Sequence, residues 1–328
     1  MHINSIGTPL FYTIFIALIL ILIAIDIQVL NKKGDHQVST AEALCWTTIW
    51  IIVSLSFAGW LYYQLADNPV FGVNIAKDKI WSFLTAYVLE KSLSIDNIFV
   101  FVLIFNYLKI PPQHQQRILI YGVLGAIILR AIMIVSGSAL VTRFEWILYF
   151  FGIFLLYSGL KLMLPEKKDQ EHNPLKNPII HWLTNHLRIS ENLHGQRFFI
   201  HVKGQLHATP LLLALVIIEL SDLIFAVDSI PAVFAVTTDP FIVFTSNILA
   251  VLGLRAMYFL LANIIEKFVY LKYGLATVLS FIGIKMLITK WVHINSAISL
   301  SIILSALLLS ILASWWQTHH VKINNNHK

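Results

Sequence analysis

The sequence predicts an all-α integral membrane protein with about nine transmembrane helices and an inverted repeat of three helices inside it. Three observations predict this fold class: the composition, the length of the apolar runs and a repeated set of motifs. Of the 328 residues, 58% are apolar and only 12% are charged, and the mean hydropathy is +0.76. Charged residues make up about a quarter of an ordinary soluble domain, so this chain is expected to lie in lipid.

The remaining composition narrows the class further. The net charge of +6 does not indicate nucleic-acid binding, because the basic residues lie between apolar runs, where they orient a membrane protein. Cys45 is the one cysteine, which excludes an intrachain disulfide and a cysteine-based metal site. The first apolar run is long enough to span and lacks a preceding basic region, so we expect a retained first helix rather than a cleaved signal.

The apolar runs define the expected helices and domains. Runs of spanning length cover about residues 9–30, 41–64, 80–108, 118–140, 144–164, 209–237, 241–264, 273–290 and 295–316. We expect two N-terminal helices over 1–64, a first repeat over 79–164, a cytoplasmic loop over 165–206, a second repeat over 207–290, and a last helix with a cytoplasmic tail over 294–328.

The long loop carries two local signals. Asn177 to Leu183 is typical of a capped helix with a proline in its first turn, and this helix would lie on the membrane surface. Alternating residues around Lys203-Gly204 predict a hairpin between Phe198 and His207.

Charge asymmetry predicts the orientation. Fifteen Lys and Arg residues fall in the loops and tail of one side and four in the loops of the other. By the positive-inside rule the N-terminus is outside and the C-terminus cytoplasmic, in the inner membrane of a bacterium.

An internal repeat links the two halves. Asp96-Asn97-Ile98-Phe99 aligns with Asp222-Leu223-Ile224-Phe225, Leu129-Arg130-Ala131 with Leu254-Arg255-Ala256, and Gly159 to Met163 with Gly283 to Leu287. Each copy contains three helices, an odd number, so the copies must be inverted relative to each other. Inverted repeats with a binding site at their interface are a transporter architecture.

Carboxylates interrupt two of the apolar runs. Glu90 and Asp96 lie in the first, and Glu219, Asp222 and Asp228 in the second. Each carboxylate in a bilayer costs on the order of 2.5–3.5 kcal/mol even on the lenient insertion scale, which favours a functional role.

Helix geometry limits which of these acids share a face. Glu219 and Asp222 are three residues apart and face the same way, whereas a separation of six residues turns a side chain by about 240°. Pro231 cannot donate to the Val227 carbonyl, so we expect a kink over 227–231 that frees a carbonyl oxygen beside Asp228.

The buried charges predict a cation site. Six acids (Asp26, Glu90, Asp96, Glu219, Asp222 and Asp228) face four basic residues (Lys91, Arg130, Arg255 and Lys285), an excess of about two negative charges. The oxygen donors are these carboxylates, the Asn97 amide, the hydroxyls of Ser94, Ser221 and Ser229, and a backbone carbonyl near Pro231. Such donors suit Mg²⁺, Ca²⁺ or Mn²⁺, and crowded carboxylates that also bind protons offer a route to antiport.

Structural interpretations remain beside the functional one. Arg130 and Arg255 could simply neutralise Asp96 and Asp222, and they are better charge-balancing or gating residues than ligands. Asp26 is either a helix-end residue or an accessory of the site. The loop histidines (His172, His181, His186, His194, His201 and His207) fit no tight ligand spacing.

The two acidic stretches, Glu90 to Asn97 and Glu219 to Ala232, resemble the signature of the TerC family of bacterial integral membrane proteins, named for tellurium resistance. The resemblance covers about residues 10–315. It implies a place in a LysE-like superfamily of cation and amino-acid exporters, and manganese efflux within an alkaline- and manganese-responsive branch. By motif, Glu90, Asp96, Asn97, Glu219, Asp222 and Asp228 take the family's acidic-site positions. Tellurite is an anion that an acid-lined site would repel.

We therefore expect a secondary transporter that exports Mn²⁺ or a similar hard cation, driven by protons or membrane potential, with no resident cofactor. The chain has no P-loop, so ATP bound by this chain does not supply the energy. The alternatives are a membrane scaffold that uses the long loop and an intramembrane aspartyl hydrolase that uses Asp96 and Asp222.

Overall fold

The computed structural model describes residues 5–33, 38–144, 146–164, 190, 195, 197–202, 205–262, 270–289, 291–292 and 294–325. This part of the chain is predominantly helical. Its helices are α1 Pro9–Lys33, α2 Thr40–Ala66, α3 Gly72–Tyr107, α4 Pro112–Arg143, α5 Ile147–Met163, α7 Pro210–Val236, α8 Pro240–Leu252, α9 Leu254–Leu261, α10 Leu271–Ile288 and α11 Ser296–Asn325.

The predicted apolar runs and the observed helices coincide closely, with two exceptions. α3 begins at Gly72, eight residues before the predicted run over 80–108. The run predicted over 241–264 is divided at Gly253 into α8 and α9, whose axes differ in direction by 42°. Glycine is a poor helix former, and this glycine leaves room for the ammonium group of Lys91, which a Cβ atom at Gly253 would displace. The glycine was visible in the sequence, but the side chain that occupies its space was not.

Six helices are long and apolar enough to cross a membrane, and the bent pair α8–α9 would make a seventh, among the residues described. These six are α1, α2, α4, α7, α10 and α11. The chain is therefore a multi-pass membrane protein, and the count of nine spans stays a prediction.

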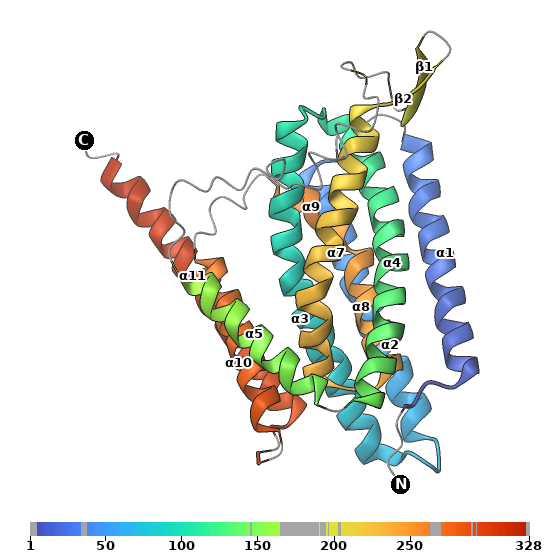
Figure 1. Cartoon of the computed structure of the whole chain (residues 1–328), viewed down its shortest axis with the longest axis vertical. Helices are drawn as coiled ribbons and strands as arrows, with labels where there is room; N and C mark the ends of the chain where they lie inside the picture. The colour runs from blue at the N-terminus through green and yellow to red at the C-terminus, as the bar shows by residue number, and fades with distance from the viewer. Residues whose placement is uncertain are drawn as a thin grey trace.

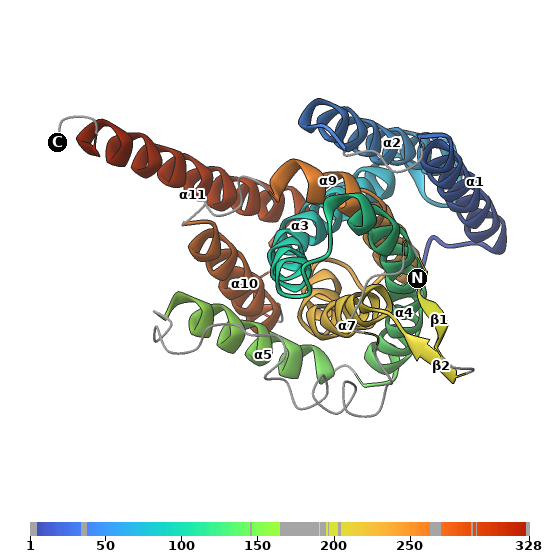
Figure 2. The same cartoon turned by 90° about the horizontal axis from the view of Figure 1, so that it is seen from above.

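The helices form two groups (Figures 1 and 2). α3 and α7 lie side by side in the middle, with α4 and α8 against them and with α1 and α2 on the outer face. α5, α10 and α11 form the second group, which leans away from α3 toward the end that carries the strands. The first group encloses a dense aromatic and aliphatic core that includes Phe15, Phe57, Phe83 and Phe241.

Small residues bring α5 and α10 into close contact. A Cβ atom at Gly283 would lie 2.7 Å from the Leu156 nitrogen and 2.8 Å from the Gly152 carbonyl oxygen. In the other direction, a Cβ atom at Gly159 would lie 2.8 Å from the Ala276 carbonyl oxygen. Backbones that approach this closely gain van der Waals contact, which drives helix association where lipid removes the hydrophobic effect.

The last residues of α3 form a regular helix cap. The Ile110 amide donates to the Phe105 carbonyl at 2.9 Å and the Lys109 amide to the Asn106 carbonyl at 3.2 Å, which is the Schellman pattern. Lys109 takes the left-handed position at φ 51°, where glycine is usual, and Ile110 and Phe105 are both buried. Pro111 and Pro112 follow, and α4 begins at Pro112.

The predicted hairpin is present. β1 (Phe199–Val202) and β2 (Gln205–Ala208) pair antiparallel with Val202 opposite Gln205. The turn at Lys203-Gly204 and the helix predicted near Asn177 lie outside the described residues. His201 and His207 project from opposite faces of the hairpin, so these two do not share a metal ion.

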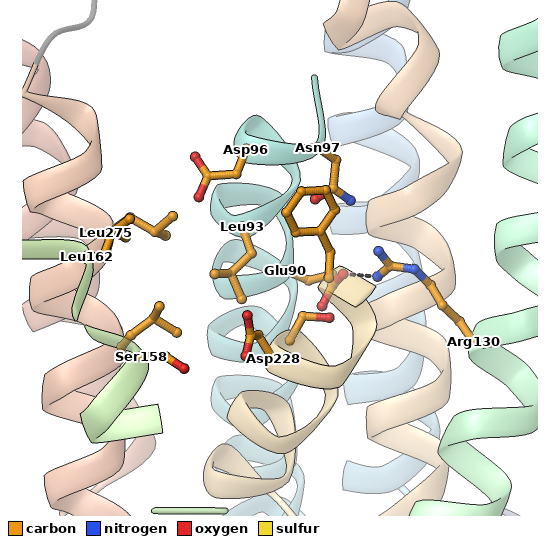
Figure 3. A pocket seen from close by; sticks show the side chains of 12 residues that line it. Glu90, Leu93, Asp96, Asn97, Arg130, Ser158, Leu162, Asp228 and Leu275 are labelled. Atoms are coloured by element: carbon orange, nitrogen blue, oxygen red, sulfur yellow. Dashed lines mark hydrogen bonds and ion pairs between the residues drawn. The ribbon is translucent and has the colours of Figure 1, made fainter. Parts of the chain in front are cut away.

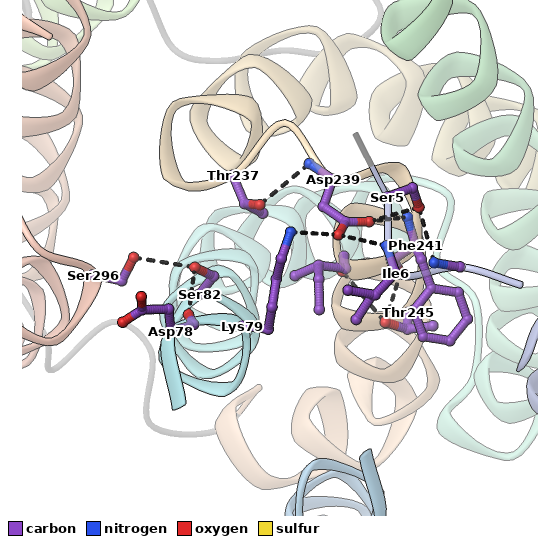
Figure 4. A network of polar contacts seen from close by, with 12 residues as sticks. Ser5, Ile6, Asp78, Lys79, Ser82, Thr237, Asp239, Phe241, Thr245 and Ser296 are labelled. Carbon is purple, nitrogen blue, oxygen red and sulfur yellow. Dashed lines mark hydrogen bonds and ion pairs between the residues drawn. The ribbon is translucent and has the colours of Figure 1, made fainter. Parts of the chain in front are cut away.

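Asp239 organises the end of the molecule where the N-terminus lies (Figure 4). Its carboxylate caps α8 through the Phe241 amide at 3.1 Å and accepts from Ser5 Oγ at 2.9 Å and the Ile6 amide at 3.0 Å. Lys79 of α3 completes the network as an ion pair at 2.6 Å. This buried carboxylate therefore ties the N-terminal segment, α3 and α8 together at the end away from the hairpin.

Candidate functional site

Arg130 of α4 is the centre of the buried polar network. Its guanidinium binds both oxygens of Asp222, at 2.9 Å from Nη2 and 3.1 Å from Nε, and it also pairs with Glu90. Nη1 donates to Asn247 of α8 at 3.1 Å, and the Asn97 amide donates to Asp222 at 3.0 Å. Side chains from α3, α4, α7 and α8 thus meet at one arginine that is 1% exposed. A bidentate guanidinium–carboxylate pair is among the strongest charged contacts in proteins.

A cavity of about 180 Å³ lies beside this network, between α3, α7, α5 and α10. Its polar lining comes from Glu90, Asp96, Asn97, Arg130, Ser158, Asp228 and Ser229, and its apolar lining from Leu93, Leu162, Phe225, Leu275 and Leu279. Figure 3 shows Asp96 and Asp228 on the side that faces α5 and α10, and Arg130 on the opposite side. The Asp228 carboxylate interacts with the Ser158 hydroxyl and with the charge of Lys161, both on α5.

Two buried oxygens at the cavity have no hydrogen-bond partner in the described part of the chain. They are Glu90 Oε2 and Ser229 Oγ. Together with the carboxylates of Asp96 and Asp228 they form a set of hard oxygen donors, which is the kind of surface that a Mg²⁺, Ca²⁺ or Mn²⁺ ion prefers. The polar part of the lining therefore has the donor chemistry of a hard-cation site.

The structure does not gather the six predicted ligands around one point. Among the described residues, no three His, Cys, Asp or Glu side chains are arranged to hold a metal ion. Glu90, Asp96, Asn97 and Asp228 line the cavity, whereas Asp222 is held by Arg130 and Asn97. Glu90 and Asp96 are six residues apart and point in different directions from α3, yet both line the cavity.

Glu219 lies apart from the cavity. Its carboxylate rests against Gly125 of α4, where a Cβ atom would overlap both carboxylate oxygens. Its Oε2 atom is buried and has no hydrogen-bond partner in the described structure. Glu219 and Asp222, which the helix spacing puts on one face of α7, both contact residues of α4.

The predicted charge-balancing residues have different partners from those expected. Lys91 donates to the Ala250 carbonyl at 2.9 Å, near the carboxyl end of α8, where a helix dipole favours a cation. Arg255 pairs with Asp26 of α1, so Asp26 is an ion-pair partner at the periphery. Arg130 neutralises Glu90 and Asp222, whereas the proposed pairing had joined the two arginines to Asp96 and Asp222.

The remaining accessory residues also separate. Ser94 donates to the Glu90 carbonyl and Ser221 to the Ile217 carbonyl, each within its own helix, whereas Ser229 lines the cavity. Pro231 lies inside α7, which continues as one helix on both sides of it. Of the three serine hydroxyls predicted as oxygen donors, the one at the cavity is therefore that of Ser229.

Asn247, Ser158 and Gly125 were not identified from the sequence. Asn247 is fully buried beside Arg130, Ser158 faces Asp228, and Gly125 receives Glu219. Asn247 and Ser158 gave a signal, since each is a polar residue inside an apolar run. Gly125 gave none, because a glycine in a membrane helix is common.

Comparisons with known proteins agree with this architecture. The family described as "Integral membrane protein TerC family" matches residues 75–322. A Photorhabdus laumondii protein is 49% identical over 98% of this chain and 99% of its own length, and an Escherichia coli K12 protein is 47% identical over 95% and 96%. Both carry the name "Putative membrane-bound redox modulator Alx". A Myxococcus xanthus protein named "Uncharacterized membrane protein STKORF319" is 45% identical over 96% of this chain and 95% of its own length.

No solved structure matches the chain. The family match covers well over half of the residues, and the similarity to these relatives extends over almost the whole of both chains. This protein therefore belongs to the TerC family of integral membrane proteins.

Proposed function

We propose that this protein is a membrane transporter that exports a divalent metal cation, with Mn²⁺ as the best-fitting substrate. The observation that carries the proposal is an excess of carboxylates beside a cavity within membrane-spanning helices. Glu90, Asp96 and Asp228 line the cavity, and Glu219 and Asp222 lie on the same helix as Asp228. In the part of the chain described, two basic side chains contact these five acids: Arg130 pairs with Glu90 and Asp222, and Lys161 lies near Asp228. Such an excess in a bilayer is costly unless cations or protons neutralise it.

The partners of the other basic residues strengthen this argument. Lys91, Arg255 and Lys285 contact a backbone carbonyl, Asp26 and Ser299 respectively, so none of them is engaged with the cavity acids by these contacts. The charge count from the sequence included all three as positive charges that balance the acids. The deficit of positive charge at the cavity is therefore larger than the sequence indicated.

The donor chemistry supports a hard ion. Carboxylate, amide and hydroxyl oxygens suit Mn²⁺, Mg²⁺ or Ca²⁺, and no cysteine lies at the cavity. Manganese efflux is also what the family resemblance implies. The Alx relatives are named for a redox role, but this chain has a single cysteine, Cys45, and cannot form an internal disulfide.

Nine spans in an inverted repeat are part of the proposal. α3 has 36 residues and runs through the middle of the bundle. It is not among the six apolar spans, because Glu90, Lys91 and Asp96 interrupt its apolar sequence. α5, with 17 residues, is just short of the spanning length applied to the others. Adding these two to the six spans and the bent pair gives nine.

The packing supports an inverted repeat. In the repeat, α3 corresponds to α7, α4 to α8 and α5 to α10. The contact between α3 and α8 therefore corresponds to the contact between α7 and α4, and both contacts are extensive. The pairs α3–α7, α4–α8 and α5–α10 are also in contact. We place the N-terminus outside and the C-terminus in the cytoplasm of a bacterial inner membrane, on the positive-inside asymmetry.

The geometry does not favour an aspartyl hydrolase. Such an enzyme needs two carboxylates that share a proton, whereas Asp222 directs both oxygens to Arg130 and Asn97. The scaffold alternative predicts that neutral variants of the cavity acids keep their function.

Uptake of Mn²⁺ into everted membrane vesicles with an acid interior tests the proposal. Everted vesicles turn export into accumulation, so the parent protein should accumulate Mn²⁺. Asp96→Asn and Asp228→Asn should not, although each is present in the membrane at the parental level. Ser92→Ala is the matched control on α3, because Ser92 donates to the Val88 carbonyl of its own helix and does not line the cavity.

Two results would count against export. If the parent does not exceed empty vesicles, the proposed function is wrong and the scaffold interpretation takes its place. If the parent transports and both Asn variants transport equally well, the cavity is not the transport site.

A further inference from the structure

Glu219 is a buried acid that the proposed metal cavity does not use. It comes from the same face of α7 as Asp222, but the residues that line the cavity do not include it. Gly125 of α4 provides the space for its carboxylate, and its Oε2 atom is buried without a hydrogen-bond partner in the described structure. An acid built into the membrane interior and kept from the metal-facing surface needs a separate explanation.

The charges around Glu219 indicate what kind of group the position requires. The charged neighbour on its own helix is Asp222, another acid. On α4, which packs against it, the charged residue of the network is Arg130, and the guanidinium is already engaged with Glu90, Asp222 and Asn247. An ionised Glu219 would thus add an uncompensated charge to the membrane interior, which is costly. The position suits a carboxyl group that gains and loses a proton.

We propose that Glu219 carries a proton that is exchanged for the exported cation, while Asp96 and Asp228 face the cation itself. This inference rests on the proposed transport function. It divides the buried acids into a proton-carrying residue, which lies against Gly125 of α4, and metal-facing residues, which line the cavity.

The Arg130 network supplies the link between the two. When Glu219 loses its proton, the new negative charge beside Asp222 draws the guanidinium toward α7 and weakens its hold on Glu90. Glu90 lines the cavity, so its carboxylate is then available to a cation. When Glu219 is protonated, Arg130 returns to Glu90 and the cation is released. Proton binding and cation binding therefore oppose each other, as antiport requires.

Two assays on the purified full-length protein in liposomes separate the roles. The first measures exchange of radioactive Mn²⁺ for unlabelled Mn²⁺ at equal pH on both sides, which needs only the cation site. The second measures accumulation of Mn²⁺ driven by a pH gradient, which also needs the proton-carrying group. Glu219→Gln imitates the protonated acid, so it should still exchange Mn²⁺ at saturating concentration, with a higher half-saturating concentration than the parent, but accumulate no more than empty liposomes. Asp228→Asn should lose both activities.

Two further variants test the position as well as the residue. Gly125→Ala should reproduce the Glu219→Gln result, because its methyl group displaces the carboxylate. Glu219→Asp keeps a titratable group and should recover part of the gradient-driven accumulation. Asp78→Asn, which neutralises an exposed carboxylate at the other end of α3, is the control and should behave as the parent.

The outcomes distinguish this inference from the proposed function. If Glu219→Gln loses exchange as well, Glu219 serves cation binding and the inference is overturned. The same follows if Glu219→Gln keeps gradient-driven accumulation, or if the parent exchanges Mn²⁺ without any response to the gradient. If the parent neither exchanges nor accumulates Mn²⁺, it is the transport function that fails.

Discussion

Arg130 shows at the scale of one residue how the membrane interior tolerates several acids. Its guanidinium is flat and presents several donors in a fixed geometry, so it can bind Asp222 with two nitrogens and still reach Glu90 and Asn247. A lysine ammonium is a point charge and could not hold the same arrangement. The arginine therefore fixes the relative positions of α3, α4, α7 and α8.

The first prediction concerns removal of this guanidinium. Arg130→Ala leaves Glu90 and Asp222 buried without their counter-ion, and breaking a buried ion pair in this way costs on the order of 3–5 kcal/mol. We expect a large drop in the temperature at which the detergent-solubilised protein aggregates, measured by size-exclusion chromatography after heating. Adding Glu90→Gln and Asp222→Asn to the variant should restore part of the loss.

Arg255 provides the matched control for this experiment. It is the repeat counterpart of Arg130, but its partner Asp26 is 17% exposed and lies at the periphery. Arg255→Ala should therefore reduce the thermal stability less than Arg130→Ala does. Equal losses for the two variants would contradict the central role of Arg130.

At this scale the sequence located the residues but not their pairing. Arg130 was predicted to balance charge, and Glu90, Asp96 and Asp228 were predicted to belong to one acidic site, where the cavity places them. Arg130 pairs with Glu90 and not with Asp96 because of the position of α4 against α3. The hydrophobic periodicity of the two helices does not specify that position.

The pairing of α5 with α10 is the clearest feature at the scale of elements. Gly152 and Gly159 face Gly283 and its neighbours, so the two backbones meet without side chains between them. α5 also carries Ser158 to the cavity, and α10 contributes Leu275 and Leu279. The close pairing therefore holds one wall of the candidate site.

The second prediction is that Gly283→Ala destabilises the protein. The added methyl group would meet backbone atoms of Gly152 and Leu156 that cannot rotate away, and overpacking of this kind typically costs about 1–3 kcal/mol. The melting midpoint of the purified protein in detergent should fall accordingly. Gly59→Ala on α2 is the control, because a Cβ atom there meets nothing within 4 Å, and its midpoint should be unchanged or higher.

Most element positions followed from the sequence, because a run of apolar residues long enough to span a bilayer is a strong and local signal. The early start of α3 at Gly72 and the break at Gly253 were not predicted. Both depend on contacts with other helices: Lys79 at the start of α3 pairs with Asp239, and the space at Gly253 is filled by Lys91. Local patterns carry no information on such distant partners.

At the scale of the whole molecule, the membrane crossing of α3 decides the topology. Its 36 residues extend about 54 Å at 1.5 Å per residue, more than the thickness of a hydrocarbon core, yet it carries three charges in its middle. If α3 did not cross, the two acidic stretches could not meet at the middle of the bilayer, and the proposed orientation of every later helix would reverse.

The third prediction tests this crossing with single cysteines in a Cys45→Ser background. Asp67 precedes α3 and Gln113 follows it, and both side chains are exposed. A membrane-impermeant maleimide applied to spheroplasts should label Asp67→Cys directly and label Gln113→Cys only after permeabilisation. Labelling of both positions from the outside would show that α3 does not cross the membrane.

The sequence by itself determined the membrane class, the approximate positions of the helices, the hairpin and the residues that carry charge into the bilayer, because hydropathy and the cost of buried charge act locally along the chain. The tertiary structure decided which acids share a cavity, that Glu219 stands apart against Gly125, and that Lys91 and Arg255 are used elsewhere. The physical reason is that an ion pair or a cavity forms between helices distant in sequence, and its geometry depends on how close their backbones come.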